Sequence, residues 1–149
     1  MLKSFVKELN DKVNEYVFEK KLFWGGCCYA AYLLAEAFVK AGIQYKVVLF
    51  ETHMTLTKDF NKSINNGFGV DHIAIQVKPG KKNFIIGDLT DFLDYRGRDI
   101  RRYKDVTPEM LLDAYENNIW NDVYNTDYNP QLKKEIFGIC AKYGCGAAE

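Results

Sequence analysis

The stretch from Cys27 to Gly42 constrains the fold more than any other part of the sequence. Apolar side chains follow Cys27 at helical spacing and also fill the other faces of the same helix: Ala31, Tyr32, Leu33, Leu34, Ala35, Phe38 and Val39. Gly42 supplies a stop at the C-terminal end. A helix that is apolar nearly all round belongs in the middle of a fold, so the other elements are expected to pack around it.

Two of those other helices are indicated by capping residues. Thr107 as N-cap with Pro108 at the first helical position predicts a helix through about Asn117, and Asn129 with Pro130 predicts another through about Lys142. A third helix is predicted over the first twenty or so residues, where apolar residues recur at helical spacing: Leu2, Phe5, Val6, Leu9, Val13, Tyr16 and Val17.

Strands are predicted at Tyr45–Phe50, His72–Lys78 and Asn83–Asp88, which are rich in β-branched and aromatic residues. Pro79 and Gly80 separate the last two, which is typical of a hairpin. The polar stretch Thr52–Gly69 is expected to be a long loop that borders the functional cleft. The alternative is a plain connection.

The expected fold class is α+β, with a central helix packed on a small antiparallel sheet and flanked by further helices. A hydrophobic share of 48% and an aromatic share of 15% are typical of a packed globular protein. No repeat or change in composition divides the chain, so residues 1–149 are expected to form a single domain.

The charge balance argues against nucleic acid and anionic membranes as partners. Twenty basic residues balance twenty acidic ones. The cluster Arg96, Arg98, Arg101, Arg102 and Lys104 is interrupted by Asp99, and a solvated face is favoured over a phosphate site. No apolar run approaches the roughly 20 residues that span a bilayer, and the charged N-terminal stretch is unlike a signal peptide, so a cytoplasmic location is expected.

Four cysteines are present at positions 27, 28, 140 and 145. A reducing compartment disfavours disulfides, so free thiols are expected. The two pairs also lack the ligand spacing of zinc ribbons and fingers, so neither a metal nor another cofactor is expected.

Cys27 is the candidate nucleophile. A cysteine attacks as thiolate, and a helix N-terminus with a nearby imidazolium lowers the thiol pKa from about 8.5. Gly25 and Gly26 allow the backbone to turn before the helix, and the first helical N–H groups can stabilise an oxyanion. Cys28 has the same neighbours but points about 100° away, toward either core or cleft. The alternative for both is that cysteines are small residues of an apolar core.

His72 is the candidate general base. It shares a strand face with Gln76, away from the aliphatic side chains, and Gln76 is therefore a further candidate for substrate contact. A hairpin centred on Gly80 sets His72 directly opposite Asp88, and a carboxylate at that distance can orient an imidazole. The alternative is a strand-end histidine beside a solvated aspartate. His53 has no carboxylate placed beside it and is the weaker candidate.

Three short motifs together resemble the transglutaminase-like superfamily of papain-like enzymes. Trp24-Gly25-Gly26-Cys27, followed by Gly42-Ile43, is similar to that family's glycine, nucleophilic cysteine, helix and Gly-Ile-Pro pattern. His72 and Asp88-Leu89-Thr90 are similar to its histidine strand and Asp-Pro-Thr. The resemblance implies a triad of Cys27 as nucleophile, His72 as general base and acid, and Asp88 as orienting carboxylate.

The sequence departs from the family pattern at three flanking positions: Gln44, Ala74 and Leu89. These departures leave the triad intact and the substrate class open. Trp24, Gly25 and Gly26 become candidates for contacting substrate or an oxyanion.

The resemblance implies a cysteine peptidase or amidase that acts on a peptide or protein amide through an acyl-enzyme. Acyl transfer of the transglutaminase or N-acyltransferase type is the alternative within the same scaffold, since fold does not decide function. A catalytically inactive binding module is the alternative from another class.

Overall fold

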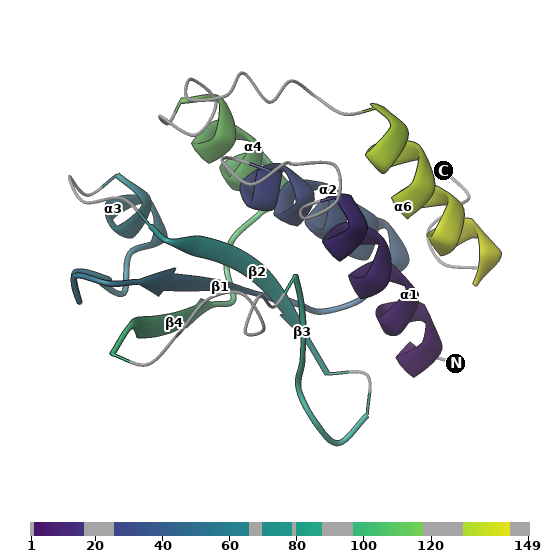
Figure 1. Ribbon diagram of the computed structural model, residues 1–149, viewed down its shortest axis with the longest axis horizontal. Helices are drawn as coiled ribbons and strands as arrows, with labels where there is room; N and C mark the ends of the chain where they lie inside the picture. Colours follow the sequence, from purple (N-terminus) through teal and green to yellow (C-terminus); the bar gives the residue numbers. More distant parts are fainter. Residues whose placement is uncertain are drawn as a thin grey trace.

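The computed structural model describes residues 2–16, 26–65, 70–78, 80–87, 97–117 and 130–143. Figure 1 shows their arrangement. The helices are α1 (Leu2–Asn14), α2 (Gly26–Ala41), α3 (Phe60–Ile64), α4 (Pro108–Glu116) and α6 (Pro130–Lys142). The strands are β1 (Lys46–Glu51), β2 (His72–Val77), β3 (Phe84–Ile86) and β4 (Asp99–Tyr103). None of the described helices has the length and apolarity needed to cross a membrane.

The four strands form one antiparallel sheet in the order β3-β2-β1-β4. Side chains alternate between the two sides of a strand. In β1, Val47 and Leu49 therefore point to one face of the sheet, and Val48 and Phe50 point to the other. This alternation gives the sheet two apolar faces of very different extent.

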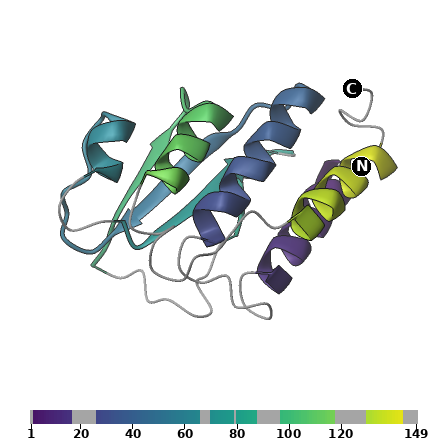
Figure 2. The ribbon, with the colours of Figure 1, turned by 90° about the horizontal axis from the view of Figure 1, so that it is seen from above.

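Helices cover the first face and bury the main core. Helix α2 packs on β2 and also contacts α4 and α6, whereas α1 contacts β3 and α6. Figures 1 and 2 show α1, α2, α4 and α6 together on this side of the sheet. The expectation of a central apolar helix is confirmed, because Leu33, Leu34 and Phe38 are all at most 1% exposed. The α+β class is confirmed as well.

The second face carries a smaller cluster. Val48, Phe50 and Ala74 are buried there, and Ile85 packs against them. His72 lies on this face, because it pairs with Phe50 in the register of β1 and β2 and its ring lies 5.7 Å from the Phe50 ring. The expectation that His72 points away from the aliphatic side of its strand therefore holds.

Local signals placed the start of α4 and the end of α2 correctly. Helix α1 ends at Asn14, earlier than the twenty or so residues predicted. Thr107 caps α4 by accepting a hydrogen bond from the Met110 N–H, and Pro108 is the first helical residue. Gly42, with φ of 71°, follows the last residue of α2. Both features depend on residues close in sequence, so the sequence alone predicts them.

Two elements correct the sequence analysis. The predicted loop Thr52–Gly69 contains α3, which Asp59 caps by accepting from the Lys62 N–H. The basic cluster, which is not among the strands predicted from the sequence, contains β4, which pairs with β1. Its arginines gain their strand conformation from a neighbouring strand, and composition does not show that partner.

The hairpin register is also corrected. Gln76 pairs with Ile85, which centres the hairpin between Gly80 and Lys81 and not on Gly80. A shift of one residue changes every cross-strand pair. The hairpin centre from which His72 was set opposite Asp88 is therefore wrong. Asp88 itself lies outside the described residues, so its place relative to His72 stays a prediction.

Candidate active site

Cys27 occupies the second position of α2, where the helix begins over β2. It is half-buried and is a free thiol. Burial raises the pKa of the Cys27 thiol, and backbone hydrogen bonds from Ile73, Cys28 and Cys27 itself act in the opposite direction. Burial is the larger effect, so this thiol is protonated at neutral pH. The predicted position at a helix N-terminus is confirmed, whereas a lowered thiol pKa is not observed.

The three backbone groups that act to lower the pKa of the Cys27 thiol come from two elements. Two belong to the first turn of α2, where N–H groups lack helical partners, and the third belongs to β2. Donors that converge in this way stabilise negative charge on sulfur, or on an oxygen that forms beside it. The chain therefore provides anion stabilisation at Cys27 through its backbone.

His72 is the first residue of β2 and is only 3% exposed. Its Nε2 lies 2.6 Å from the carbonyl oxygen of Gly87. A carbonyl only accepts, so Nε2 carries the proton and Nδ1 is the basic nitrogen. Burial lowers the pKa of His72 to about 4, against smaller raising effects from Gly87 and Asp71. The imidazole is therefore neutral at neutral pH, and burial opposes its protonation.

Gly87 is held in place from a distant part of the chain. Its N–H donates to Asn10 Oδ1 of α1 at 2.8 Å, and its φ is 83°, in the region that favours glycine. The fixed carbonyl then selects the tautomer of His72. Sequence reasoning missed both Asn10 and Gly87, because their contact joins residues far apart in the chain. A glycine at the end of a predicted strand was the one available signal.

Cys27 and His72 line the same small cavity. Its volume is about 10 Å³, and its other walls include Ala31, Leu34 and Gly87. That is the space of about one water molecule. No hydrogen bond joins Cys27 to His72 in the described structure, since α2 covers the first face of the sheet and the imidazole packs against Phe50 on the second.

Asp71 is the carboxylate that acts on His72 within the described residues. It accepts a hydrogen bond from Arg98 Nε at 2.6 Å and another from the Thr52 hydroxyl. Its effect on His72 is electrostatic. Asp71 directly precedes the first residue of β2, and sequence analysis did not consider it. The orienting role that the resemblance implies belongs to Asp88, which lies outside the described residues.

The other candidate residues fall in three places. Cys28 is fully buried and donates from its thiol to the Leu111 carbonyl at 3.6 Å, so its side chain belongs to the contact between α2 and α4. Gln76 is not part of the Cys27 cavity, and its Oε1 accepts from Arg102 Nε at 2.7 Å. Gly26 begins α2. Trp24 and Gly25 lie outside the described residues.

No group of three or more histidine, cysteine, aspartate or glutamate side chains gathers as a metal site in the described ranges. Comparisons with protein-family models, with curated proteins and with solved structures give no match. The functional argument therefore depends on the geometry at Cys27 and His72.

Proposed function

We propose that this protein is a cysteine-dependent hydrolase of peptide or protein amides, with Cys27 as nucleophile, His72 as general base and acid, and a papain-like or transglutaminase-like arrangement of helix and sheet. The observation that carries the proposal is the position of Cys27 in the first turn of α2, where backbone N–H groups lack helical partners, at a small cavity that His72 also lines. These groups suit a nucleophilic sulfur and the oxyanion that its attack creates.

The protonation states define the mechanism. Cys27 is a neutral thiol and His72 a neutral imidazole, so the enzyme starts without a thiolate–imidazolium pair. Attack on a carbonyl carbon forms the C–S bond while the thiol proton passes to Nδ1 of His72. The resulting imidazolium keeps its Nε2–H bond to Gly87.

The remaining steps return the enzyme to its starting state. His72 gives its proton to the leaving amine as the C–N bond breaks, which leaves an acyl group on Cys27. Water, with His72 as base, then hydrolyses the thioester and restores the thiol. Acyl transfer differs only in that an amine replaces this water. Asp88 is retained in the proposal as the orienting carboxylate that the resemblance implies.

The cavity must open for this reaction, because about 10 Å³ admits no acyl group. The imidazole packs against Phe50 on the second face of the sheet, so opening also has to move it to the side of the sheet that carries Cys27.

A catalytically inactive binding module is the second candidate. The missing Cys27–His72 hydrogen bond and the neutral thiol favour it. On this alternative, Cys27 is a packing residue at the start of α2 and the chain acts through its surface.

Acetylation by p-nitrophenyl acetate separates the two functions. The hydrolase should take one acetyl group on Cys27, located by peptide mass spectrometry, and release it again in water. His72→Gln, whose amide can still donate to Gly87, should slow acetylation about tenfold or more because it removes the base. Cys28→Ala is the matched control and should react like the wild type. If neither Cys27→Ala nor His72→Gln changed the rate of acetylation, the hydrolase would be contradicted and the binding module favoured.

A further inference from the structure

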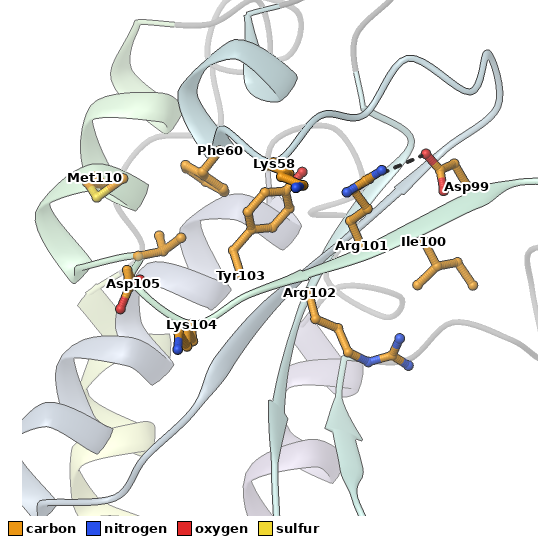
Figure 3. A pocket seen from close by; sticks show the side chains of 11 residues that line it. Lys58, Phe60, Asp99, Ile100, Arg101, Arg102, Tyr103, Lys104, Asp105 and Met110 are labelled. Atoms are coloured by element: carbon orange, nitrogen blue, oxygen red, sulfur yellow. Dashed lines mark ion pairs between the residues drawn. The ribbon is translucent and has the colours of Figure 1, made fainter.

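A groove follows the outer edge of β4, the last strand in the sheet order. It has a volume of about 680 Å³, and every residue from Asp99 to Val106 lines it, together with Lys58, Phe60 and Met110. Consecutive strand residues point to alternate faces, so only a groove along the edge can contact them all. Figure 3 shows this alternation, with Arg101 and Tyr103 on one side of β4 and Ile100 and Arg102 on the other.

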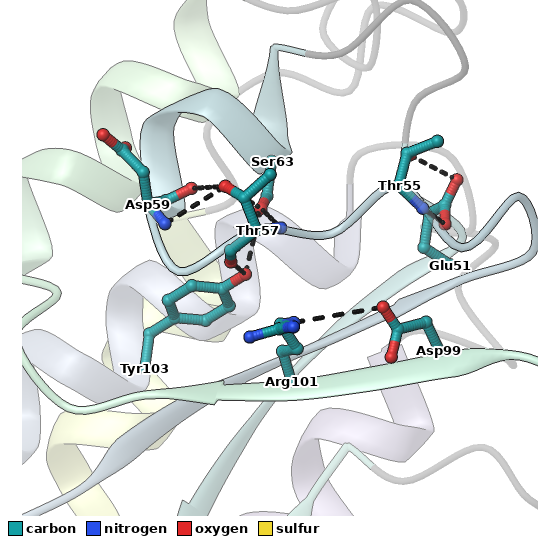
Figure 4. A network of polar contacts seen from close by, with 8 residues as sticks. All are labelled: Glu51, Thr55, Thr57, Asp59, Ser63, Asp99, Arg101 and Tyr103. Carbon is teal, nitrogen blue, oxygen red and sulfur yellow. Dashed lines mark hydrogen bonds and ion pairs between the residues drawn. The ribbon is translucent and has the colours of Figure 1, made fainter.

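The wall of the groove beside β4 is held by polar contacts. The Tyr103 hydroxyl donates to the Thr57 carbonyl at 2.5 Å and lies 3.0 Å from Ser63 Oγ. The Thr57 N–H donates to the same Ser63 oxygen at 2.8 Å. Figure 4 shows how this network ties the chain before α3 to β4. The groove is thus framed by fixed elements on both sides.

The groove is cationic. Lys58, Arg101, Arg102 and Lys104 outnumber the acidic residues Asp99 and Asp105. Arg101 lies 4.0 Å from Asp99, at the limit of an ion pair, and Arg102 binds Gln76. Lys58 and Lys104 are exposed and have no ion pair in the described part of the chain.

The cationic surface continues beyond the end of β4. A second hollow of about 720 Å³ shares Lys104, Asp105 and Val106 with the groove and adds Lys46 and Lys78 to its walls. The combined surface carries more lysine than acid, with Lys46, Lys58, Lys78 and Lys104 against Asp99 and Asp105.

We propose that the outer edge of β4 is a docking site for an acidic peptide segment of a partner protein, which binds in extended form and adds a strand to the sheet. An edge strand offers unpaired backbone N–H and C=O groups, and these supply affinity in strand addition. Carboxylates on alternate residues of the peptide would meet the cations of the groove. This site is independent of the proposed hydrolase activity, because β4 and the β2–β3 side are opposite edges of the sheet.

A second copy of this chain is a poorer occupant. Antiparallel pairing of two β4 strands along their full length sets Arg101 of one copy directly opposite Arg101 of the other. Like charges directly opposite each other destabilise a strand pair. Basic residues on an exposed edge are a known defence against such self-association.

The test uses a blocked, fluorescein-labelled heptapeptide of alternating valine and glutamate, measured by fluorescence anisotropy with the full chain. Binding should weaken with added salt. Lys58→Glu/Lys104→Glu should raise Kd about tenfold, because two favourable charge contacts become repulsive. The matched control is Lys3→Glu/Lys134→Glu on α1 and α6, where two exposed lysines that line neither hollow undergo the same change, and its Kd should stay near that of the wild type.

A peptide that is N-methylated at alternate backbone nitrogens distinguishes strand addition from charge attraction. Its binding should be lost, and amide NMR shifts caused by the unmodified peptide should concentrate in residues 99–106. Equal binding of the methylated peptide, an equal loss in both double variants, or no binding of the acidic peptide would overturn the proposal. A stable dimer in sedimentation that Arg101→Glu disrupts would overturn the choice of occupant. Acetylation of Cys27 is measured in a separate experiment, so a negative result for one proposal does not decide the other.

Discussion

His72 links the ionisation of one side chain to the stability of the fold. Its pKa falls from 6.5 to about 4 on burial, so between these values the unfolded chain binds a proton that the folded chain does not. The free energy of unfolding therefore decreases as pH falls from about 6.5 to about 4, by up to roughly 3 kcal/mol. Urea unfolding at a series of pH values measures this dependence.

The sequence offers a matched control, because it contains just two histidines. His72→Gln should remove most of the loss of stability between neutral pH and pH 4, whereas His53→Gln, at an exposed position, should leave it in place. An unchanged pH profile in His72→Gln would mean that carboxylates and not this imidazole control acid stability.

The Cys27 thiol should react slowly at rest. Burial raises its pKa, and the thiolate is the form that attacks iodoacetamide. Its alkylation at neutral pH should be slower than that of a short cysteine peptide and should increase as pH rises. Mass spectrometry of the labelled protein gives the rate at each cysteine. Rapid labelling of Cys27 at neutral pH would show a resting thiolate and would replace general-base activation with a preformed ion pair.

Among the helices and strands, α4 has an N-terminus that a single side chain caps. Thr107 Oγ1 accepts from the Met110 N–H at 3.2 Å. Thr107→Ala should lower the free energy of unfolding by about 1 kcal/mol, because that N–H loses its side-chain acceptor. Thr107→Ser keeps an acceptor and should remain close to the wild type. Equal losses in both variants, measured by urea denaturation, would assign the effect to the Thr107 methyl group.

Helices α1, α2, α4 and α6 were predictable from sequence because their signals are local, whereas α3 was missed although Asp59 caps it. Thr107, Pro108 and Gly42 act on backbone groups a few residues away. Strand β4 was not predictable in the same way, since the sequence Asp99–Tyr103 becomes a strand only through pairing with β1. The predicted register of β2 and β3 was wrong for a related reason. Moving the turn centre by half a residue changes every cross-strand pair.

The same distinction between local and long-range signals applies to the candidate site. Cys27 at the start of α2 followed from helical spacing and glycine positions. The Asn10–Gly87–His72 chain of hydrogen bonds joins α1, the end of β3 and β2, and no short-range pattern encodes it. Burial also reversed the expected thiol pKa, and burial depends on the packed molecule as a whole.

In the whole molecule, the two helices nearest the chain ends close the core together. Helix α6 contacts α1, and both Lys142 and the Tyr143 hydroxyl bind Glu8. Leu132 and Ile136 of α6 are fully buried in the same core as Phe5 of α1. The α1–α6 pair also supports the candidate site, because Asn10 of α1 holds Gly87.

This arrangement predicts that damage to α6 spreads to the sheet. Ile136→Ala leaves a cavity in the main core and should lower the free energy of unfolding by about 2–4 kcal/mol. If the molecule unfolds as one unit, the free energy of opening of the slowest-exchanging amides in β1 and β2 should fall by the same amount, although the substitution lies in α6. Native-state hydrogen exchange measures this. Lys134→Ala, at an exposed position of the same helix, should change stability by no more than about 0.5 kcal/mol. Unchanged exchange in β1 and β2, beside faster exchange in α6, would show that α6 opens separately. The Asn10 contact to Gly87 would then have to be maintained by α1 without its partner helix.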